Sequence, residues 1–130
     1  MDAQLQYYQA KLDYEWDAAD LFDELEKGRQ VVVVDARKPA AYEEQHIPGA
    51  ISLPHRTISE LSTQGWSKNP VYVCYCDGIG CNASTKGALK LTQLGFKVKE
   101  LIGGIEWWKR DGYATDGGKA VKGTRVKCAC

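Results

Sequence analysis

The stretch VYVCYCDGIGCNAS, residues 71–84, decides the fold of this chain and the chemistry that it can support. Residues 71–75 form an apolar run typical of a buried strand, a glycine-containing loop starts at Cys76, and a helical pattern then continues to Gly95. A strand, a tight loop and a helix in this order are typical of an open parallel sheet, in which sites form outside the carboxyl ends of the strands. We therefore expect Cys76 to lie at the floor of a site.

The loop that follows Cys76 has the features of an anion-binding loop. The next helix is expected to begin at Asn82 or Ala83, so its positive N-terminal end faces the sulfur and favours the thiolate, which is the nucleophilic form. Two glycines in the loop leave backbone N–H groups uncovered. We predict that the whole loop binds the substrate through Asp77, Gly78, Ile79, Gly80, Cys81 and Asn82. Cys74, within the apolar run, is predicted to be a core residue.

The remaining elements indicate an α/β fold. Residues 31–34 are four consecutive valines, which is typical of a strand covered on both faces in a parallel sheet, and residues 96–101 predict another strand. A helix is expected between Asp17, a good N-cap residue, and Gly28. Because strands alternate with helices, we predict a mainly parallel sheet flanked by helices.

The chain divides into three parts by pattern. Apolar residues at helical spacing predict a helical extension over residues 1–15, and the alternating elements define a domain over residues 16–113. Residues 114–130 are rich in Gly and Lys and are predicted to be a flexible tail. Within the domain, Thr57-Ile58-Ser59-Glu60 matches a capping box and predicts a further short helix.

Composition limits the function. The chain has 130 residues, with 17 basic residues balanced by 17 acidic ones, so no net charge attracts nucleic acid or an anionic membrane, and we expect neither as a partner. The N-terminus has no basic segment followed by an apolar run, and no stretch is long enough to cross a membrane. Five cysteines in no framework spacing suit a reducing compartment, so a cytoplasmic protein is predicted.

Several motifs in order resemble the rhodanese-like domains. The first is Val34-Asp35-Ala36-Arg37 followed by His46-Ile47-Pro48-Gly49-Ala50, and the second is Tyr75-Cys76 with its loop, followed by Leu101-Ile102-Gly103-Gly104-Ile105. The resemblance covers roughly residues 16–112 and implies a single domain with a five-stranded, mainly parallel sheet. It also implies that Cys76 is the nucleophilic cysteine at the start of the active-site loop.

The family resemblance implies a sulfurtransferase. The Cys76 thiolate would take the outer sulfur of thiosulfate or of a persulfide donor, and the resulting persulfide would pass that sulfur to a thiol or to cyanide. Asp35 and Arg37 match the strand-end pair of the family and are predicted to support the site as a structural ion pair. We predict no cofactor.

The loop departs from the common pattern in its charge. It carries no basic residue before Lys86, and Asp77 adds a negative charge. A dianionic donor would therefore need Lys86, His55 or Arg56 near the mouth of the site, and a protein persulfide is the alternative donor. The position six after Cys76 is Asn82, which argues against related phosphatases that need an arginine there.

The sequence allows several roles for Cys81. It lies five residues after Cys76, close enough to form a disulfide with it, to resolve an oxidised or persulfidated Cys76, or to be the nucleophile itself. A zinc site made with Cys128 and Cys130 is disfavoured by the spacing, so no metal is predicted. A second class of function is a rhodanese-like thiol-redox or protein-docking module that uses Cys76 and Cys81.

Overall fold

Five parallel strands form the centre of the fold, in the order β1-β5-β4-β2-β3. The structure, a computed structural model, describes residues 2–124. Its strands are β1 (Glu15–Trp16), β2 (Val31–Asp35), β3 (Ile51–Ser52), β4 (Val71–Tyr75) and β5 (Lys97–Leu101). The predicted α/β class with a five-stranded parallel sheet is confirmed.

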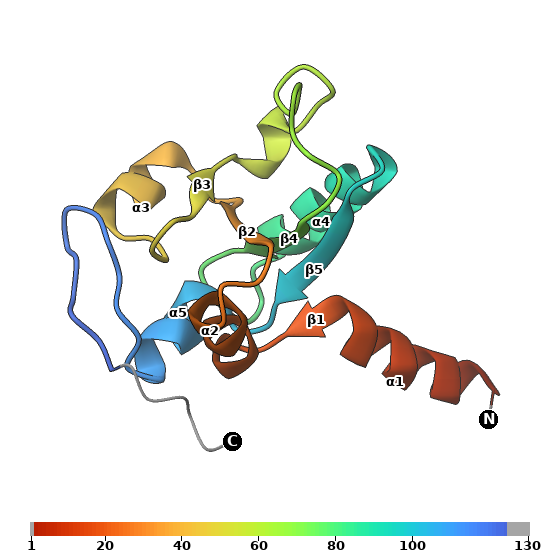
Figure 1. Cartoon of the computed structure of the whole chain (residues 1–130), viewed down its shortest axis with the longest axis horizontal. Coiled ribbons are helices and arrows are strands. Elements are labelled where there is room, and N and C mark those ends of the chain that lie inside the picture. Colours follow the sequence, from red (N-terminus) through yellow and green to blue (C-terminus); the bar gives the residue numbers. More distant parts are fainter. Residues whose placement is uncertain (1, 125–130) are drawn as a thin grey trace.

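Helices cover both faces of this sheet (Figure 1). They are α1 (Asp2–Tyr14), α2 (Ala18–Glu26), α3 (Pro39–Glu44), α4 (Ala83–Gln93) and α5 (Gly104–Arg110), with a 3₁₀ turn at His55–Thr57. Helix α1 extends away from the sheet beside β1, and none of its residues is buried. No helix within residues 2–124 is both long and apolar enough to cross a membrane.

Two apolar cores result from the alternation of side chains along the strands. Val33, Val73 and Tyr75 point to the face covered by α2 and α5, where they pack with Phe22 and Trp108. The neighbouring residues on the same strands point to the opposite face and pack with α4 and the 3₁₀ turn; they include Val34, Tyr72 and Cys74. Cys74 is fully buried there, as expected for a core residue.

The strand order places a crevice at the carboxyl ends of β2 and β4. After β2 the chain moves outward to β3, whereas after β4 it moves outward to β5, so the two neighbouring strands lead in opposite directions. Ligands of open α/β sheets bind at such a switch point. Asp35 of β2 pairs in register with Tyr75 of β4, so Arg37 and Cys76 follow on adjacent strands at the same edge.

Two local predictions about helix starts had different outcomes. Asp17 caps α2 as expected: its side chain accepts from the Asp20 N–H at 2.8 Å, and the Asp20 carboxylate accepts from the Asp17 N–H. The short helix predicted from Thr57 is wrong, because Thr57 ends a 3₁₀ turn. Ser59 and Ser62 bond each other's backbone N–H groups reciprocally and close a turn instead.

The segment after Tyr113 is held more closely than the predicted flexible tail. His46 and Asp116 exchange two backbone hydrogen bonds of 2.9 Å as an antiparallel bridge. Thr115 is buried, and its Oγ1 accepts from Gln45 Nε2 at 2.8 Å and from the Val121 N–H at 3.1 Å. The packed structure therefore continues beyond residue 113, while Cys128 and Cys130 lie outside the described residues.

We expect Thr115→Val to lower the free energy of unfolding by about 1–3 kcal/mol, because it leaves two part-buried donors without their acceptor. Urea unfolding followed by tryptophan fluorescence measures this. The control is Thr92→Val, which removes an exposed hydroxyl that bonds only its own helix, to the carbonyl of Ala88. Equal stability of the two variants would show that the segment after Tyr113 adds nothing to the fold.

Candidate functional site

Cys76 follows directly from β4 and is fixed by the start of α5. Its carbonyl oxygen accepts from the Ile105 N–H at 3.0 Å, and the Asp77 carbonyl accepts from the Glu106 N–H at 2.9 Å. Gly104 makes this approach possible: it has φ +57°, and a Cβ there would collide with the backbone of Cys76 and Asp77. The position of Cys76 is thus set by the sheet on one side and by a helix end on the other.

The loop ends where α4 begins. Helix α4 begins at Ala83, one of the two predicted starts, and the carbonyl of its N-cap residue Asn82 accepts from the Lys86 N–H at 3.0 Å. Between the two ends, Cys76 and Cys81 are joined in a disulfide, with their Cα atoms 6.2 Å apart. Cys76 is 3% exposed in this form, whereas Cys81 is partly exposed. This is the disulfide that the five-residue spacing allowed.

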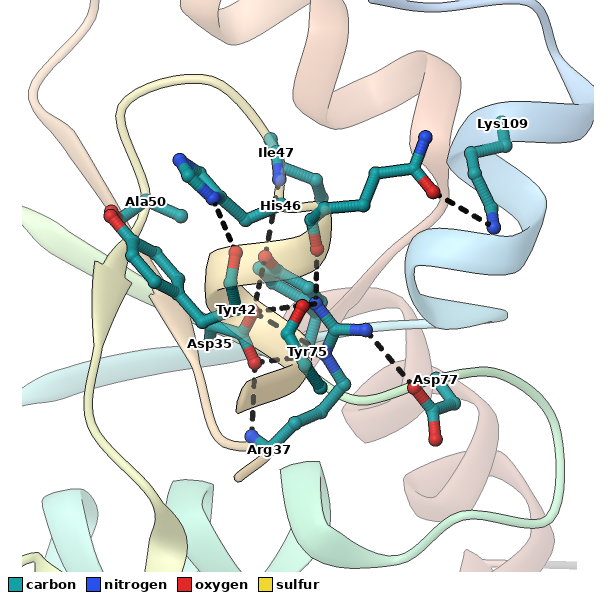
Figure 2. Close-up of polar contacts among 11 residues, drawn as sticks. Asp35, Arg37, Tyr42, His46, Ile47, Ala50, Tyr75, Asp77 and Lys109 are labelled. Atoms are coloured by element: carbon teal, nitrogen blue, oxygen red, sulfur yellow. Dashed lines mark hydrogen bonds and ion pairs between the residues drawn. The ribbon is translucent and has the colours of Figure 1, made fainter. Parts of the chain in front are cut away.

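A buried polar network supports the crevice from β2 (Figure 2). The Asp35 carboxylate is completely buried, and it accepts from the Arg37 side chain at 2.8 and 3.0 Å and from the Tyr75 hydroxyl at 2.7 Å. The Tyr75 hydroxyl in turn accepts from the Ile47 N–H at 3.2 Å. Burial, followed by the charge of Asp35, raises the pKa of Tyr75, so this hydroxyl stays a donor.

Arg37 joins this network to the loop and to α3. Its Nη1 lies 3.1 Å from the Asp77 carboxylate, and its Nη2 donates to the Gln45 carbonyl at 2.6 Å. Its side chain is 9% exposed, whereas that of Asp77 is 74% exposed. Burial opposes its charge, but the hydrogen bonds and charge of Asp35 outweigh burial and raise the pKa of Arg37. Arg37 therefore stays cationic and offsets part of the charge of Asp77.

A cavity of about 460 Å³ opens between the two strand ends and the 3₁₀ turn. Cys76, Asp77 and Cys81 line it from the loop, and Arg37 lines it from the segment that follows β2. The remaining lining includes three basic side chains, which are Lys38, His55 and Arg56. The cavity is thus lined by the cysteine pair and by the basic side chains of Arg37, Lys38 and Arg56, with Asp77 as its one carboxylate.

His55 contributes little positive charge at neutral pH. Burial, together with the nearby charges of Lys86, Lys90 and Arg56, lowers the pKa of His55. The Lys90 ammonium donates to the His55 carbonyl at 2.8 Å, which holds this turn against α4. Below its folded-state pKa, His55 would add a charge to a site that is already cationic.

The structure gathers most of the residues that the sequence singled out. Asp35, Arg37, Cys76, Asp77 and Cys81 meet at one edge of the sheet, whereas the other four predicted loop residues do not line the cavity in this disulfide form; these are Gly78, Ile79, Gly80 and Asn82. His55 and Arg56 lie at the cavity, as a dianionic donor would require.

Lys38 was not foreseen, although its position directly after Arg37 at a strand end was the available signal. Among residues 2–124 there is no cluster of three or more His, Cys, Asp or Glu side chains that could hold a metal ion. The chemical groups that this cavity offers a ligand are therefore mainly its cysteines and its cationic side chains.

The chain matches a known domain family. Residues 17–111 match the model of the rhodanese-like domain. The chain is 38% identical over 97 residues to thiosulfate sulfurtransferase GlpE of Coxiella burnetii, covering 74% of this chain and 88% of that protein.

Two solved structures resemble this chain. The BH2092 protein of Bacillus halodurans is 43% identical, with a TM-score of 0.87 over 98% of this chain and 94% of that one. The rhodanese-like domain of Alr3790 from Anabaena is 29% identical, with a TM-score of 0.69 over 79% of this chain and 78% of that one. This chain belongs to the rhodanese-like family.

Proposed function

We propose that this protein is a sulfurtransferase that works through a persulfide on Cys76. The observation that carries the proposal is the position of Cys76: it directly follows the central strand β4, at the switch point of the sheet, in a cavity with more cations than carboxylates. The relative from Coxiella burnetii is named a thiosulfate sulfurtransferase, which supports the same reaction class here.

The chemistry begins with reduction of the Cys76–Cys81 disulfide, because a disulfide sulfur is not a nucleophile. The freed Cys76 thiolate attacks the outer sulfur of the donor, the sulfur–sulfur bond of the donor breaks, and sulfite leaves with its electron pair when the donor is thiosulfate. Loop N–H groups between Asp77 and Asn82 would hold the charge of the terminal sulfur. A thiol or cyanide then accepts that sulfur.

The charges around the cavity favour a small anionic donor. Asp77 is paired with Arg37, so its repulsion of an anion is reduced, while Lys38 and Arg56 add positive charge at the cavity wall. Thiosulfate fits this environment. A protein persulfide remains the alternative donor, and a reducing compartment such as the cytoplasm is the proposed location, because it would regenerate the free Cys76.

We also propose that Asp35 and Arg37 brace the site and take no part in the reaction. Asp35 is completely buried and its carboxylate is saturated by Arg37 and Tyr75, so it faces no space that a substrate occupies. Arg37 reaches the loop only through the Asp77 carboxylate.

The second candidate function is a thiol-redox module, which the disulfide itself favours. In that case the reduced protein would be oxidised and re-reduced but would not cleave a sulfur donor.

Cys76→Ser should abolish release of sulfite from thiosulfate by the reduced protein, because a serine hydroxyl does not replace the thiolate. One sulfite per chain is expected from the wild type, assayed in a single turnover. The control is Cys74→Ala, a buried thiol whose pKa burial raises to about 12, which should still release sulfite. Loss of sulfite release only in Cys81→Ser would identify Cys81 as the nucleophile. If no form released sulfite, the thiol-redox module would be the better account of the function.

Arg56→Gln should raise the KM for thiosulfate roughly three- to tenfold, since one solvent-screened charge contributes about 1 kcal/mol to the binding of an anion. Initial rates at several donor concentrations and two ionic strengths measure this, and the effect should shrink at high salt. The control is Arg29→Gln, at the amino end of β2 and thus at the opposite edge of the sheet. The same KM in both variants would place donor binding elsewhere.

Asp35→Asn should lower the free energy of unfolding by about 3–5 kcal/mol, because it leaves the charge of Arg37 buried without its main partner. Asp77→Asn removes the exposed partner of the same guanidinium and should cost about 0–1 kcal/mol. Chemical denaturation of both variants makes the comparison. Similar losses in the two would contradict the bracing role of Asp35.

A further inference from the structure

Cys81 is the nearest thiol to the proposed nucleophile, and the loop is shaped to bring the two sulfurs together. The Cα atoms lie 6.2 Å apart, within the range of disulfide-bonded pairs. Gly80, with φ +92°, and the hydrogen bond from the Cys81 N–H to the Gly78 carbonyl at 3.2 Å turn the chain back on itself. The turn lies between two fixed ends, at α5 and at the start of α4.

We propose that Cys81 resolves the Cys76 persulfide and releases its outer sulfur as sulfide, which makes this domain a dithiol-dependent reductase of sulfane sulfur. The proposal rests on the sulfurtransferase function given above, since it needs the Cys76 persulfide as its starting point. It adds a second catalytic thiol and a second product.

The reaction balances in three steps. First, the Cys76 thiolate takes the outer sulfur of thiosulfate and sulfite leaves. Second, the Cys81 thiolate attacks the inner sulfur, Sγ of Cys76; the bond from Sγ to the outer sulfur breaks, and that sulfur leaves as hydrosulfide with the proton of the persulfide. Third, an external dithiol reduces the Cys76–Cys81 disulfide and is oxidised to its own disulfide. Overall, thiosulfate and a dithiol give sulfite, sulfide and an oxidised dithiol.

The observed disulfide is the product of the second step. Attack on the outer sulfur would only move the persulfide to Cys81, whereas attack on Sγ of Cys76 forms the bond that this structure contains. The inner sulfur is therefore within reach of Cys81 without movement of the strand or of either helix.

The exposures of the two cysteines suit the third step. Cys81 is partly exposed and Cys76 is buried, so an incoming thiol meets the sulfur of Cys81. Cys76 is then the leaving group, and the N-terminal end of α4, whose first residue Ala83 lines the same cavity, would favour its thiolate form. Reduction in this direction frees Cys76 in its nucleophilic form, ready for the next donor.

The remaining described cysteine cannot take the same role. Cys74 is fully buried on the α4 face of the sheet, and burial raises its pKa to about 12. Its thiol is neutral at physiological pH, so it neither attacks a persulfide nor receives an external reductant.

The test is a single turnover of the full chain, reduced with a dithiol and freed of it, then mixed with thiosulfate. Sulfite, sulfide and the intact mass of the protein are measured together. The wild type should release one sulfite and one sulfide per chain and lose two hydrogen atoms in mass. Cys81→Ser should release sulfite, gain one sulfur atom that a thiol removes, and give at least about tenfold less sulfide.

The outcomes separate the two proposals. No sulfite from either form would overturn the sulfurtransferase and, with it, this inference. Sulfite with a persistent persulfide on the wild type and no sulfide would overturn the role of Cys81 alone. The matched control is Cys128→Ser/Cys130→Ser, which should behave as the wild type; loss of sulfide in this variant and not in Cys81→Ser would assign resolution to the C-terminal cysteines.

Discussion

The buried carboxylate of Asp35 is the constraint on which the site depends. It lies at the end of β2, where a buried charge without partners would be very costly; Arg37, which follows β2, and Tyr75, at the end of β4, are its partners. Because Tyr75 precedes Cys76 by one residue, the bond that satisfies Asp35 also fixes the strand end that carries the cysteine. The Arg37 guanidinium also contacts the Asp77 carboxylate in the loop. The partners of one buried charge therefore position both walls of the crevice.

The central elements could be predicted because their signals are local. The four valines of β2 and the strand, loop and helix around Cys76 appear where the sequence places them, and Asp35 and Arg37 form the expected ion pair. The capping box at Thr57 failed for a local reason as well: a Ser pair two residues further on satisfies the same kind of backbone donors in a turn.

The missed features depend on residues far apart in the chain. Arg37 and Asp77 are 40 residues apart, and their contact follows from the pairing of β2 with β4, which no local pattern encodes. No sequence pattern predicted the attachment of residues 114–119. Most of its hydrogen bonds join backbone groups, which place little demand on side-chain type. The cationic cavity wall likewise requires the 3₁₀ turn to lie beside β2 and the cysteine loop.

The close contact at Gly104 attaches the start of the cysteine loop to helix α5, so the loop has no independent hinge there. Helix α5 binds the carbonyls of Cys76 and Asp77 at its first turn, and its Trp108 packs among the aromatic residues Phe22 and Tyr113. Helix α5 therefore connects the loop directly to this aromatic core. A substitution that loosens this core would therefore also disturb the backbone position of Cys76, the proposed nucleophile.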